Sequence, residues 1–460
     1  MKKIKYAATV ILSRGPDHDP EVYLARRAPE IRFFGDYWVF PGGNLDKVDY
    51  ADDDGDLDSA FRRCAVREAS EEINITIQPR DLVPVFRITT PPFAPVLFDT
   101  LFMHARASDN ETPQIDNHEL VEGQFVRPSE VLDAWRQGEI KIAPPVLYLL
   151  EMLAVSGLAG FFDLAREAND RLEQGHLHPV YFSPGIFMAP LSTHTIPPAT
   201  TTNTMIVGTE KLYIVDPATA DESEQQRLCN KLDALVAEGK RLQGILLTHH
   251  HFDHVGAVNV VSQRYGIPVH AHELCYPLIP DGYLKGKSLV DGDILDLGTA
   301  PDGSDNWHLQ VMHTPGHAVD HLCFLESRYQ AAIVGDMLST VSTILINPPE
   351  GHMRTYLDSL ERLLNTPMRT LYPAHGPAHR DGAELIRYFI KHRHDREVAI
   401  IESLHQTPQS TNDILPKIYD DVPESVYPIA VRSLLASLIK LEEDGVCEQS
   451  DAGWRLCQPG

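Results

Sequence analysis

Basic residues are scarce in this 460-residue sequence, where 40 Lys and Arg stand against 65 Asp and Glu and leave a net charge of −25. That balance opposes non-specific binding to nucleic acid and to anionic membranes, although it permits a local basic groove. The six cysteines include no C-x-x-C pair, so we expect reduced thiols and a cytoplasmic protein. No apolar stretch approaches membrane-spanning length, and we expect no membrane partner.

The length of the chain predicts two or three domains, and its 43% hydrophobic content is ample for several cores. Changes in the pattern of helices and strands place the predicted boundaries. We expect a first domain over residues 1–172, a second over 180–380 and a small third domain over 381–460. Oligomeric state cannot be predicted from these features.

One stretch concentrates metal-binding side chains in the middle of the chain. Residues 244–247 form a short apolar run that predicts a buried strand, and Thr-His-His-His-Phe-Asp-His follows it. Because side chains alternate along extended backbone, His249 and His251 can point the same way. Asp253 and His254 then begin the next turn. Imidazoles and a carboxylate at this spacing predict a metal site.

Three further candidates follow in later segments. His317 lies in His-Thr-Pro-Gly-His, Asp336 ends Ile-Val-Gly-Asp, and His375 lies in Leu-Tyr-Pro-Ala-His-Gly. Each stands where an apolar, strand-like segment gives way to a loop with Gly or Pro, which is where layered α/β folds present ligands. Asp216 ends another such strand, where a support for the metal loop and an ordinary turn residue are both open interpretations.

With these motifs in this order, the chain resembles the metallo-β-lactamase superfamily. The resemblance implies an αβ/βα sandwich with two metals at one sheet edge. It implies that His249, His251 and His317 hold one metal, that Asp253, His254 and His375 hold the other, and that Asp336 bridges them. His250 matches no ligand position and is interpreted as a supporting or structural residue. Zn²⁺ suits this histidine-rich set best, with Fe or Mn as substitutes.

A second motif lies on a helix predicted over residues 58–73, after the turn Phe40-Pro41-Gly42-Gly43. Glu68, Glu71 and Glu72 fall at i, i+3 and i+4, so their carboxylates share one face of this helix. Like charges so close together destabilise a bare helix, and a hard divalent cation such as Mg²⁺ would relieve the repulsion.

The Arg-Glu-Ala-Ser-Glu-Glu segment resembles the core of the Nudix box, and the phrase from residue 60 to 69 looks most like its coenzyme A diphosphatase branch. The resemblance implies a Nudix α/β/α sandwich in which Glu68, Glu71 and Glu72 bind Mg²⁺ or Mn²⁺, with Glu68 also catalytic, and Arg67 supports the carboxylates. Asn74 stands where the family has Gly, and Ser59 where it has Glu. Glu119 and Glu122 are both candidates for a further ligand.

The C-terminal segment predicts helices at 383–403, 414–419 and 430–441, followed by strand, turn and strand over 445–456. This arrangement resembles a winged helix and the C-terminal part of the lactamase-like endoribonucleases. However, the 430–441 helix offers only Arg432 and Lys440, and three acidic residues follow it, unlike a basic recognition helix. We therefore expect a packing or dimerisation element.

These observations predict a hydrolase with two kinds of centre. In the histidine-rich centre, a metal-bound hydroxide attacks an ester, thioester or phosphodiester, and Asp253 takes part in proton transfer as well as binding metal. The Nudix domain acts on a nucleoside diphosphate-linked or coenzyme A-type substrate. The expected partners are small molecules, namely a nucleotide or coenzyme A conjugate or an acyl thioester. The alternative is a single-strand endoribonuclease with the Nudix domain as a non-catalytic nucleotide sensor.

Overall fold

β1 (Ile4–Arg14) carries apolar side chains on both faces of the N-terminal sheet. Ala8, Val10 and Leu12 face one side of the strand and Ile11 faces the other, and all four are fully buried. A strand that is apolar on both faces needs a cover on each of them. In the computed structural model, which describes residues 4–31, 33–50, 56–94, 96–108, 111–115 and 118–457, helices cover both faces.

The N-terminal sheet runs in the order β3-β2-β1-β6-β5, and two further strands, β4 and β7, pair with β1 and β2. The β1–β6 pair is parallel and holds ten residue pairs in register, from Ile4 opposite Leu97 to Ser13 opposite Arg106. The other strands are β2 (Glu21–Arg27), β3 (Trp38–Val39), β4 (Gly42–Asn44), β5 (Val83–Thr89), β6 (Leu97–Arg106) and β7 (Leu120–Val126).

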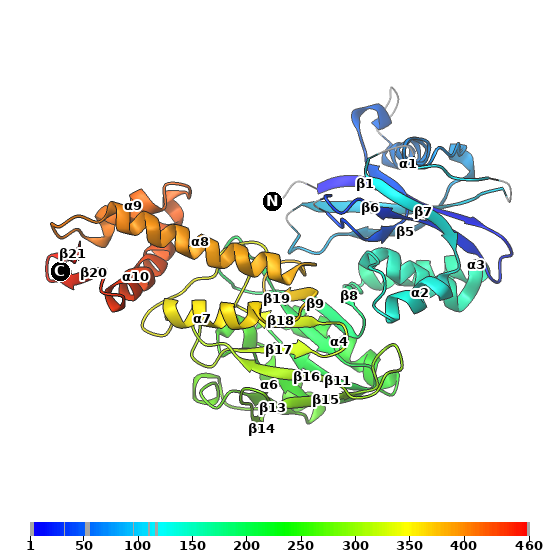
Figure 1. Ribbon diagram of the computed structural model, residues 1–460. Coiled ribbons are helices and arrows are strands. Elements are labelled where there is room, and N and C mark those ends of the chain that lie inside the picture. The colour runs from blue at the N-terminus through cyan, green and yellow to red at the C-terminus, as the bar shows by residue number, and fades with distance from the viewer. Residues whose placement is uncertain are drawn as a thin grey trace. The chain divides into compact units, whose positions relative to one another are not determined.

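One face of this sheet packs against α1 (Leu57–Ile73), through Phe61, Cys64 and Ala65 of the helix. The other face packs against α2 (Pro128–Arg136) and α3 (Pro144–Glu173), which cover it with Leu132, Leu150 and other apolar side chains. The predicted α/β/α sandwich is confirmed (Figure 1). α1 begins one residue before the predicted start, because the Asp56 side chain accepts hydrogen bonds from the amides of residues 58 and 59.

α3 consists of two helical segments with a break between them. The break falls at Gly157, whose φ of 59° and ψ of −169° lie outside the helical region. The joined helix is long and apolar enough to cross a bilayer by length and composition, so the expectation that no segment reaches that length is wrong. Half of its apolar stretch is buried, and Leu147, Leu150 and Phe161 belong to the core described above.

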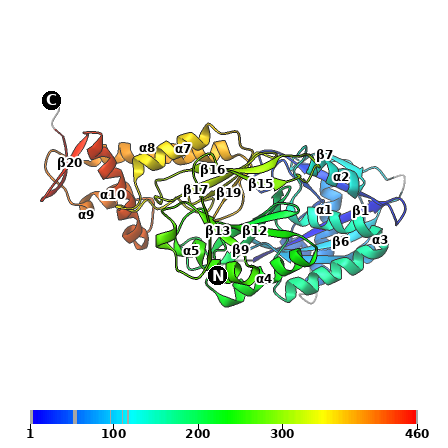
Figure 2. The same ribbon diagram turned by 90° about the horizontal axis from the view of Figure 1, so that it is seen from below.

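The histidine-rich part of the chain contains two sheets, ordered β14-β13-β12-β11-β10-β9-β8 and β15-β16-β17-β18-β19. Helices α5 (Phe252–Val255) and α6 (Val258–Tyr265) follow β12 in the chain, and Figure 2 labels α5 and β12. The strands are β8 (Tyr181–Ser183), β9 (Ile186–Ser192), β10 (Thr201–Val207), β11 (Lys211–Val215), β12 (Arg241–Leu246), β13 (Pro268–Ala271), β14 (Leu284–Ser288), β15 (Ile294–Gly298), β16 (Trp307–His313), β17 (Leu322–Glu326), β18 (Ala331–Gly335) and β19 (Thr370–Pro373).

α7 (Met353–Leu364) and α8 (Gly382–Ser403) pack together with strands of the second sheet. Their buried side chains, including Leu360 and Phe389, meet Val334 of β18 in one apolar cluster. α4 (Glu222–Ala237) lies between β11 and β12 in the sequence. The predicted αβ/βα sandwich is thereby confirmed.

The C-terminal segment has its own small core. α9 (Thr411–Ile418), α10 (Tyr427–Glu443) and the antiparallel hairpin of β20 (Cys447–Ser450) and β21 (Gly453–Leu456) follow the end of α8. Leu434, Leu438 and Trp454 are among the side chains buried between them. Helices followed by a hairpin are the winged-helix arrangement that the sequence predicts.

The described residues form two compact units. One comprises residues up to 190 with 226–239 and 299–305, and the other comprises 191–225, 240–298 and 306–457. The boundaries predicted at 172, 180 and 380–381 stay predictions.

The buried His104 of β6 predicts a pH-dependent stability of the N-terminal sheet. Burial lowers the pKa of His104 from 6.5 to about 4, and its Nε2 lies 2.8 Å from Ser13 Oγ. Between these two pKa values the unfolded chain binds a proton that the folded chain does not, so stability is lost as the pH falls from 6.5 to 4. At about 1.4 kcal/mol per unit, the loss is about 3 kcal/mol.

Urea unfolding followed by amide exchange on β6, at pH 7 and pH 4.5, measures this loss. His104→Gln keeps a partner for Ser13 and cannot titrate, so the variant should lose much less stability over the same interval. An identical pH dependence in the two proteins would contradict this assignment.

Candidate metal centre and Nudix-type site

Four strand ends deliver the predicted ligands of the histidine-rich centre. The loop after β12 carries His249 to His254, and the loop after β16 carries His317. Asp336 directly follows β18, and His375 follows β19. Of the seven predicted ligands in these loops, all except His251 are buried. The structure therefore brings together the seven predicted side chains, namely His249, His251, Asp253, His254, His317, Asp336 and His375.

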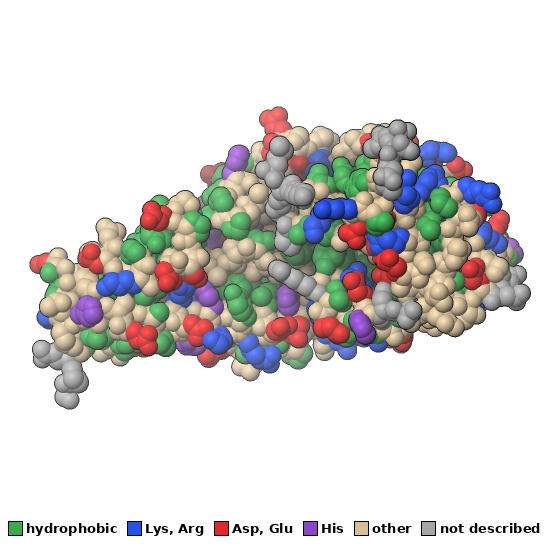
Figure 3. Space-filling view, turned by 90° about the horizontal axis from the view of Figure 1, so that it is seen from above, with side chains coloured by type: hydrophobic (Ala, Val, Ile, Leu, Met, Phe, Trp, Pro, Cys, Tyr) green, Lys and Arg blue, Asp and Glu red, His purple; other side chains and the backbone are tan. Residues whose placement is uncertain are grey.

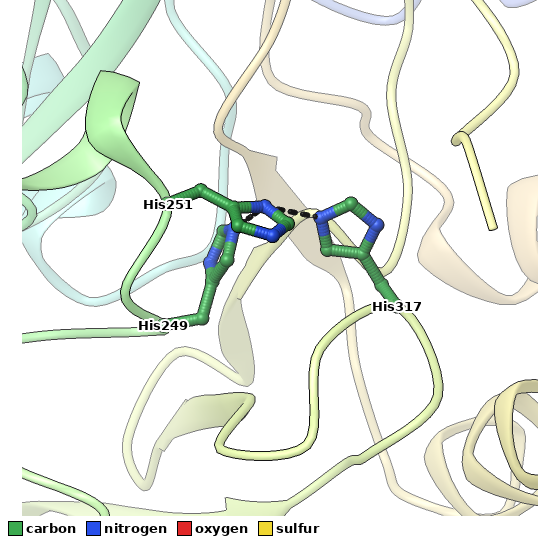
Figure 4. A group of neighbouring side chains, drawn as sticks. All are labelled: His249, His251 and His317. Atoms are coloured by element: carbon green, nitrogen blue, oxygen red, sulfur yellow. Dashed lines mark hydrogen bonds between the residues drawn. The ribbon is translucent and has the colours of Figure 1, made fainter. Parts of the chain in front are cut away.

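Three imidazoles converge on one point. His251 Nδ1 lies 3.0 Å from His249 Nε2 and 3.0 Å from His317 Nε2 (Figure 4). A neutral imidazole offers one donor and one acceptor, and each of these rings has its other nitrogen turned away from the point of convergence. Three lone pairs aimed at one place are the geometry that holds a transition metal.

Asp336 lies between this group and a second one. Its Oδ2 is 3.5 Å from His317 Nε2, whereas its Oδ1 is 3.3 Å from His375 Nε2 and 3.5 Å from His254 Nε2. Asp253 Oδ2 approaches His375 Nε2 at 3.6 Å. The two oxygens of Asp336 therefore face two separate sets of ligand atoms, as a bridging carboxylate would.

Two buried atoms in this cluster are left without a hydrogen-bond partner among the described residues. They are His254 Nε2 and Asp336 Oδ1. Orphaned buried polar atoms are rare, and each one costs on the order of 1–3 kcal/mol. A cation between the two groups would satisfy both atoms, so the residues present fit a metal pair.

The protonation states suit metal binding on one side of the centre. Burial and the neighbouring histidines hold the pKa of His249 well below its usual range, and burial lowers that of His317 to about 4. Burial alone would raise the pKa of Asp336, but His375 and His254 bring it well below its usual value. Metal ligands must be neutral imidazoles or carboxylates, which these groups are at neutral pH.

Asp216 supports the metal loop through hydrogen bonds to Thr248 and His254. It is buried, and its carboxylate accepts hydrogen bonds from the Thr248 amide at 2.7 Å and the Thr248 hydroxyl at 2.6 Å. Its Oδ2 is also 2.9 Å from His254 Nδ1, which leaves Nε2 of that ring for a ligand. Of the two interpretations that the sequence left open, these contacts favour a support for the metal loop over an ordinary turn residue.

Asp216→Asn should therefore weaken metal binding. The amide NH₂ would face the ring N–H of His254 in one orientation and the backbone N–H of Thr248 in the other, so one of these two donors would lose its acceptor. The expected loss is about 10- to 100-fold in metal affinity, measured by chelator competition. Asp358→Asn, on the exposed face of α7, is the matched control, and equal losses in both variants would contradict the assignment.

Sequence analysis missed several groups that hold the histidines. The Leu345 carbonyl lies 2.8 Å from His317 Nδ1, and the Thr201 carbonyl lies 3.0 Å from His375 Nδ1. Glu350 lies 3.2 Å from His250 and 3.4 Å from His251. Backbone carbonyls carry no residue-type signal, and Glu350 stands in a loop with no recognisable motif.

His250 turns away from the cluster. Its Nδ1 lies 2.8 Å from Asp320 Oδ1, a fully buried carboxylate, and its Nε2 faces Glu350. This placement is consistent with its interpretation as a supporting residue.

In the N-terminal unit, the glutamates of α1 are divided between two partners. Arg67 contacts Glu68 at 2.8 Å, Glu71 at 3.0 Å and the buried Asp49 at 2.9 Å. Glu72 instead accepts a 2.8 Å hydrogen bond from the Gly42 amide, and burial raises its pKa to about 8. Among the described residues, the groups close enough to share one metal ion all lie in the histidine-rich centre.

The turn before α1 is shaped around these carboxylates. A Cβ added to Gly43 would lie 2.3 Å from Glu68 Oε1, so no larger residue fits while Glu68 stays in place. Both candidates for a further ligand pair with arginines, Glu122 with Arg26 at 2.5 Å and Glu119 with Arg27 at 3.2 Å. Burial raises the pKa of Glu68 and Glu72, and the charge of Glu119 adds a smaller contribution in the same direction, so these contacts do not choose between the two candidates.

Comparison with protein families identifies three segments. Residues 3–145 match the NUDIX domain, residues 197–375 match the metallo-beta-lactamase superfamily, and residues 410–454 match the beta-lactamase associated winged helix domain. These matches confirm both predicted resemblances and their order along the chain.

Individual relatives match the histidine-rich part. A "Lactamase-like protein nscB" of Trichophyton equinum is 30% identical over 261 residues, which are 53% of this chain and 72% of that protein. An "Atrochrysone carboxyl ACP thioesterase" of Claviceps purpurea is 29% identical over 50% of this chain and 71% of that protein. The crystal structure of a beta-lactamase domain protein from Burkholderia ambifaria shares the fold with a TM-score of 0.51 and 19% identity, over 61% of this chain and 93% of that one.

The ligand cluster, the two-sheet fold and these matches agree with one another. The chain belongs to the metallo-beta-lactamase superfamily, with a NUDIX domain before that domain and a beta-lactamase associated winged helix domain after it.

Proposed function

We propose that the histidine-rich centre hydrolyses an acyl thioester with the help of two bound transition metals. The observation that carries this proposal is the position of Asp336, whose two oxygens face two separate groups of ligand atoms. The similarity to a protein named as a carrier-protein thioesterase supports the choice of bond. Zn²⁺ suits the donor set, with Fe or Mn as substitutes.

The roles of the side chains follow from their positions. His249, His251 and His317 would hold one metal, and Asp253, His254 and His375 the other, with Asp336 shared. A metal pair in such a site supplies a water of lowered pKa and a polarised carbonyl. Asp253 lies at the edge of the cluster, 3.6 Å from His375, where its carboxylate can accept the proton of the attacking water.

The test is a substrate panel on purified protein that has been stripped of metal and reloaded with Zn²⁺, Fe²⁺ or Mn²⁺. Acyl-coenzyme A esters are followed by release of free thiol, and short single-stranded RNA by cleavage. The proposal expects metal-dependent thiol release. RNA cleavage without thiol release would contradict the thioesterase proposal and would support the endoribonuclease alternative.

The winged-helix segment gives that alternative little support. Arg432 donates to Asn347, and Lys440 pairs with Glu397 at 2.9 Å and Asp444 at 3.0 Å, so both basic residues of α10 are engaged within the protein. On the face of this segment visible in Figure 3, acidic and basic side chains are interspersed. A phosphate backbone needs a continuous basic surface instead.

A second activity is proposed for the NUDIX domain, namely hydrolysis of a diphosphate linkage in a nucleotide or coenzyme A conjugate. Glu68, Glu71 and Glu72 would bind Mg²⁺ or Mn²⁺, and Glu68 would also act in catalysis. The specific observation is the contact of the Gly42–Gly43 turn with Glu72 and Glu68, because it builds a loop around the carboxylates. Both domains would then act on related conjugates, one at the thioester and the other at the diphosphate.

Coenzyme A itself tests this second activity by release of phosphopantetheine. In the sensor alternative, nucleotide binding would only modulate the other centre. Glu71→Gln separates the two: loss of phosphopantetheine release supports catalysis. Unchanged activities that are still modulated by nucleotide would support the sensor.

A further inference from the structure

The segment of residues 344–352, which we call the strap, contacts two of the three histidines at the first metal position. The Leu345 carbonyl lies 2.8 Å from His317 Nδ1, and Glu350 Oε1 lies 3.4 Å from His251 Nε2. In both rings the opposite nitrogen, His317 Nε2 or His251 Nδ1, points to the convergence described above. The third histidine, His249, uses Thr248 instead.

These contacts have a chemical meaning for metal binding. An imidazole that binds metal through one nitrogen carries its proton on the other, and that N–H needs an acceptor to fix the ring. The strap places an acceptor beside both rings, namely the Leu345 carbonyl at hydrogen-bond distance from His317 and the Glu350 carboxylate 3.4 Å from His251. Glu350 Oε1 is buried and has no hydrogen-bond partner among the described residues, and it lies 3.2 Å from His250 Nε2 and 3.4 Å from His251 Nε2. A proton on His251 Nε2 would give this orphaned oxygen a partner.

Other residues of the strap form hydrogen bonds with the C-terminal helices α8 and α10. Arg432 of α10 donates to Asn347 Oδ1 at 3.1 Å, and Glu443 of α10 lies 2.9 Å from His352 Nε2. The buried Arg393 of α8 donates to the Ile344 carbonyl.

Backbone hydrogen bonds also hold the strap, both within itself and to the loop that carries His317. The Gly351 amide bonds the Asn347 carbonyl at 2.8 Å, and the His352 amide bonds the carbonyl of Gly316, next to His317, at 2.7 Å. A displacement at Asn347 or His352 is therefore passed to the residues that hold His317 and His251.

We propose that the winged-helix segment is a positioning element for the first metal position, acting through the strap, with Glu350 as its principal positioning residue. This inference rests on the proposed metal centre and adds a function for the C-terminal segment. A second ligand set of His250, His251 and Glu350 is geometrically close, but His251 Nε2 carries a proton whenever Nδ1 binds metal, so Glu350 acts as an acceptor there.

The experiment measures Zn²⁺ affinity by competition with a chromophoric chelator, with Mg²⁺ in excess to occupy the carboxylate sites of the NUDIX domain. Four variants of the full chain are compared with the wild type: Glu350→Ala, Glu350→Gln, the double variant Arg432→Ala/Glu443→Ala, and Arg455→Ala. Arg455 pairs with Glu448 within the hairpin and does not touch the strap, so it is the matched control.

One of two Zn²⁺ binding steps should weaken, by about 10-fold in Glu350→Ala and roughly threefold in the double variant, since lost outer partners typically cost 10–100-fold. Glu350→Gln keeps an acceptor oxygen and should recover part of the loss, and Arg455→Ala should match the wild type. A double variant with wild-type affinity at both steps would overturn the proposal. So would equal weakening of both steps together with a lower Tm, which is the behaviour of general destabilisation.

Thiol release is measured on the same samples and separates the two proposals. The wild type could bind two Zn²⁺ and the variants could show the predicted affinities while no thioester is cleaved. That result would refute the proposed substrate and would leave the proposed role of the strap standing.

Discussion

Replacing Asp336 by Asn should abolish hydrolysis by the histidine-rich centre. The carboxylate faces His317 with one oxygen and His375 and His254 with the other, so an amide would withdraw a charged ligand from both metal positions at once. Loss of an outer partner alone costs about 10- to 100-fold in metal affinity or activity, so loss of a shared ligand should exceed about 100-fold. Thiol release and metal content are measured together.

The variant should still fold, because Asn is nearly isosteric with Asp and the change leaves the packing around this position intact. Asp358→Asn on α7 again controls for a carboxylate lost elsewhere. Asp336→Asn protein with full activity and two equivalents of metal would show that the centre is not the one described.

Gly43→Ala should remove the proposed diphosphate hydrolysis and leave thiol release unchanged. The new Cβ would lie 2.3 Å from Glu68 Oε1 and 2.5 Å from its Cδ, so the Glu68 carboxylate must move. A displacement of about 1 Å in a catalytic group can cost on the order of 100-fold in rate. Phosphopantetheine release from coenzyme A measures this loss.

Glu68→Gln provides the companion measurement for the same site, since it changes the chemistry of the carboxylate without crowding the turn. Both variants should lose phosphopantetheine release while thiol release serves as an internal control for folding. Full diphosphate hydrolysis in Gly43→Ala would mean that Glu68 takes no part in that reaction.

The convergence of the candidate ligands was predictable from sequence because each of them lies within a few residues of a strand end. Strand patterns are local, and the turns after them restrict where a side chain such as His317 or His375 can point. The positions of β12, β18 and β19 follow from their apolar runs, and all four loops meet at one place as a result.

The support of that cluster was not predictable in the same way. Glu350 and the Leu345 carbonyl belong to a loop whose path depends on α8 and α10, which follow it in the chain. Long-range packing decides that path, and it leaves no periodic trace in the sequence.

Metal analysis of purified protein, combined with chelator treatment, tests the central claim most directly. The seven converging side chains predict about two transition-metal ions per chain, loss of thiol release when a chelator removes them, and recovery when Zn²⁺ is returned. Protein that contains no transition metal and releases thiol at the same rate in chelator would contradict the account.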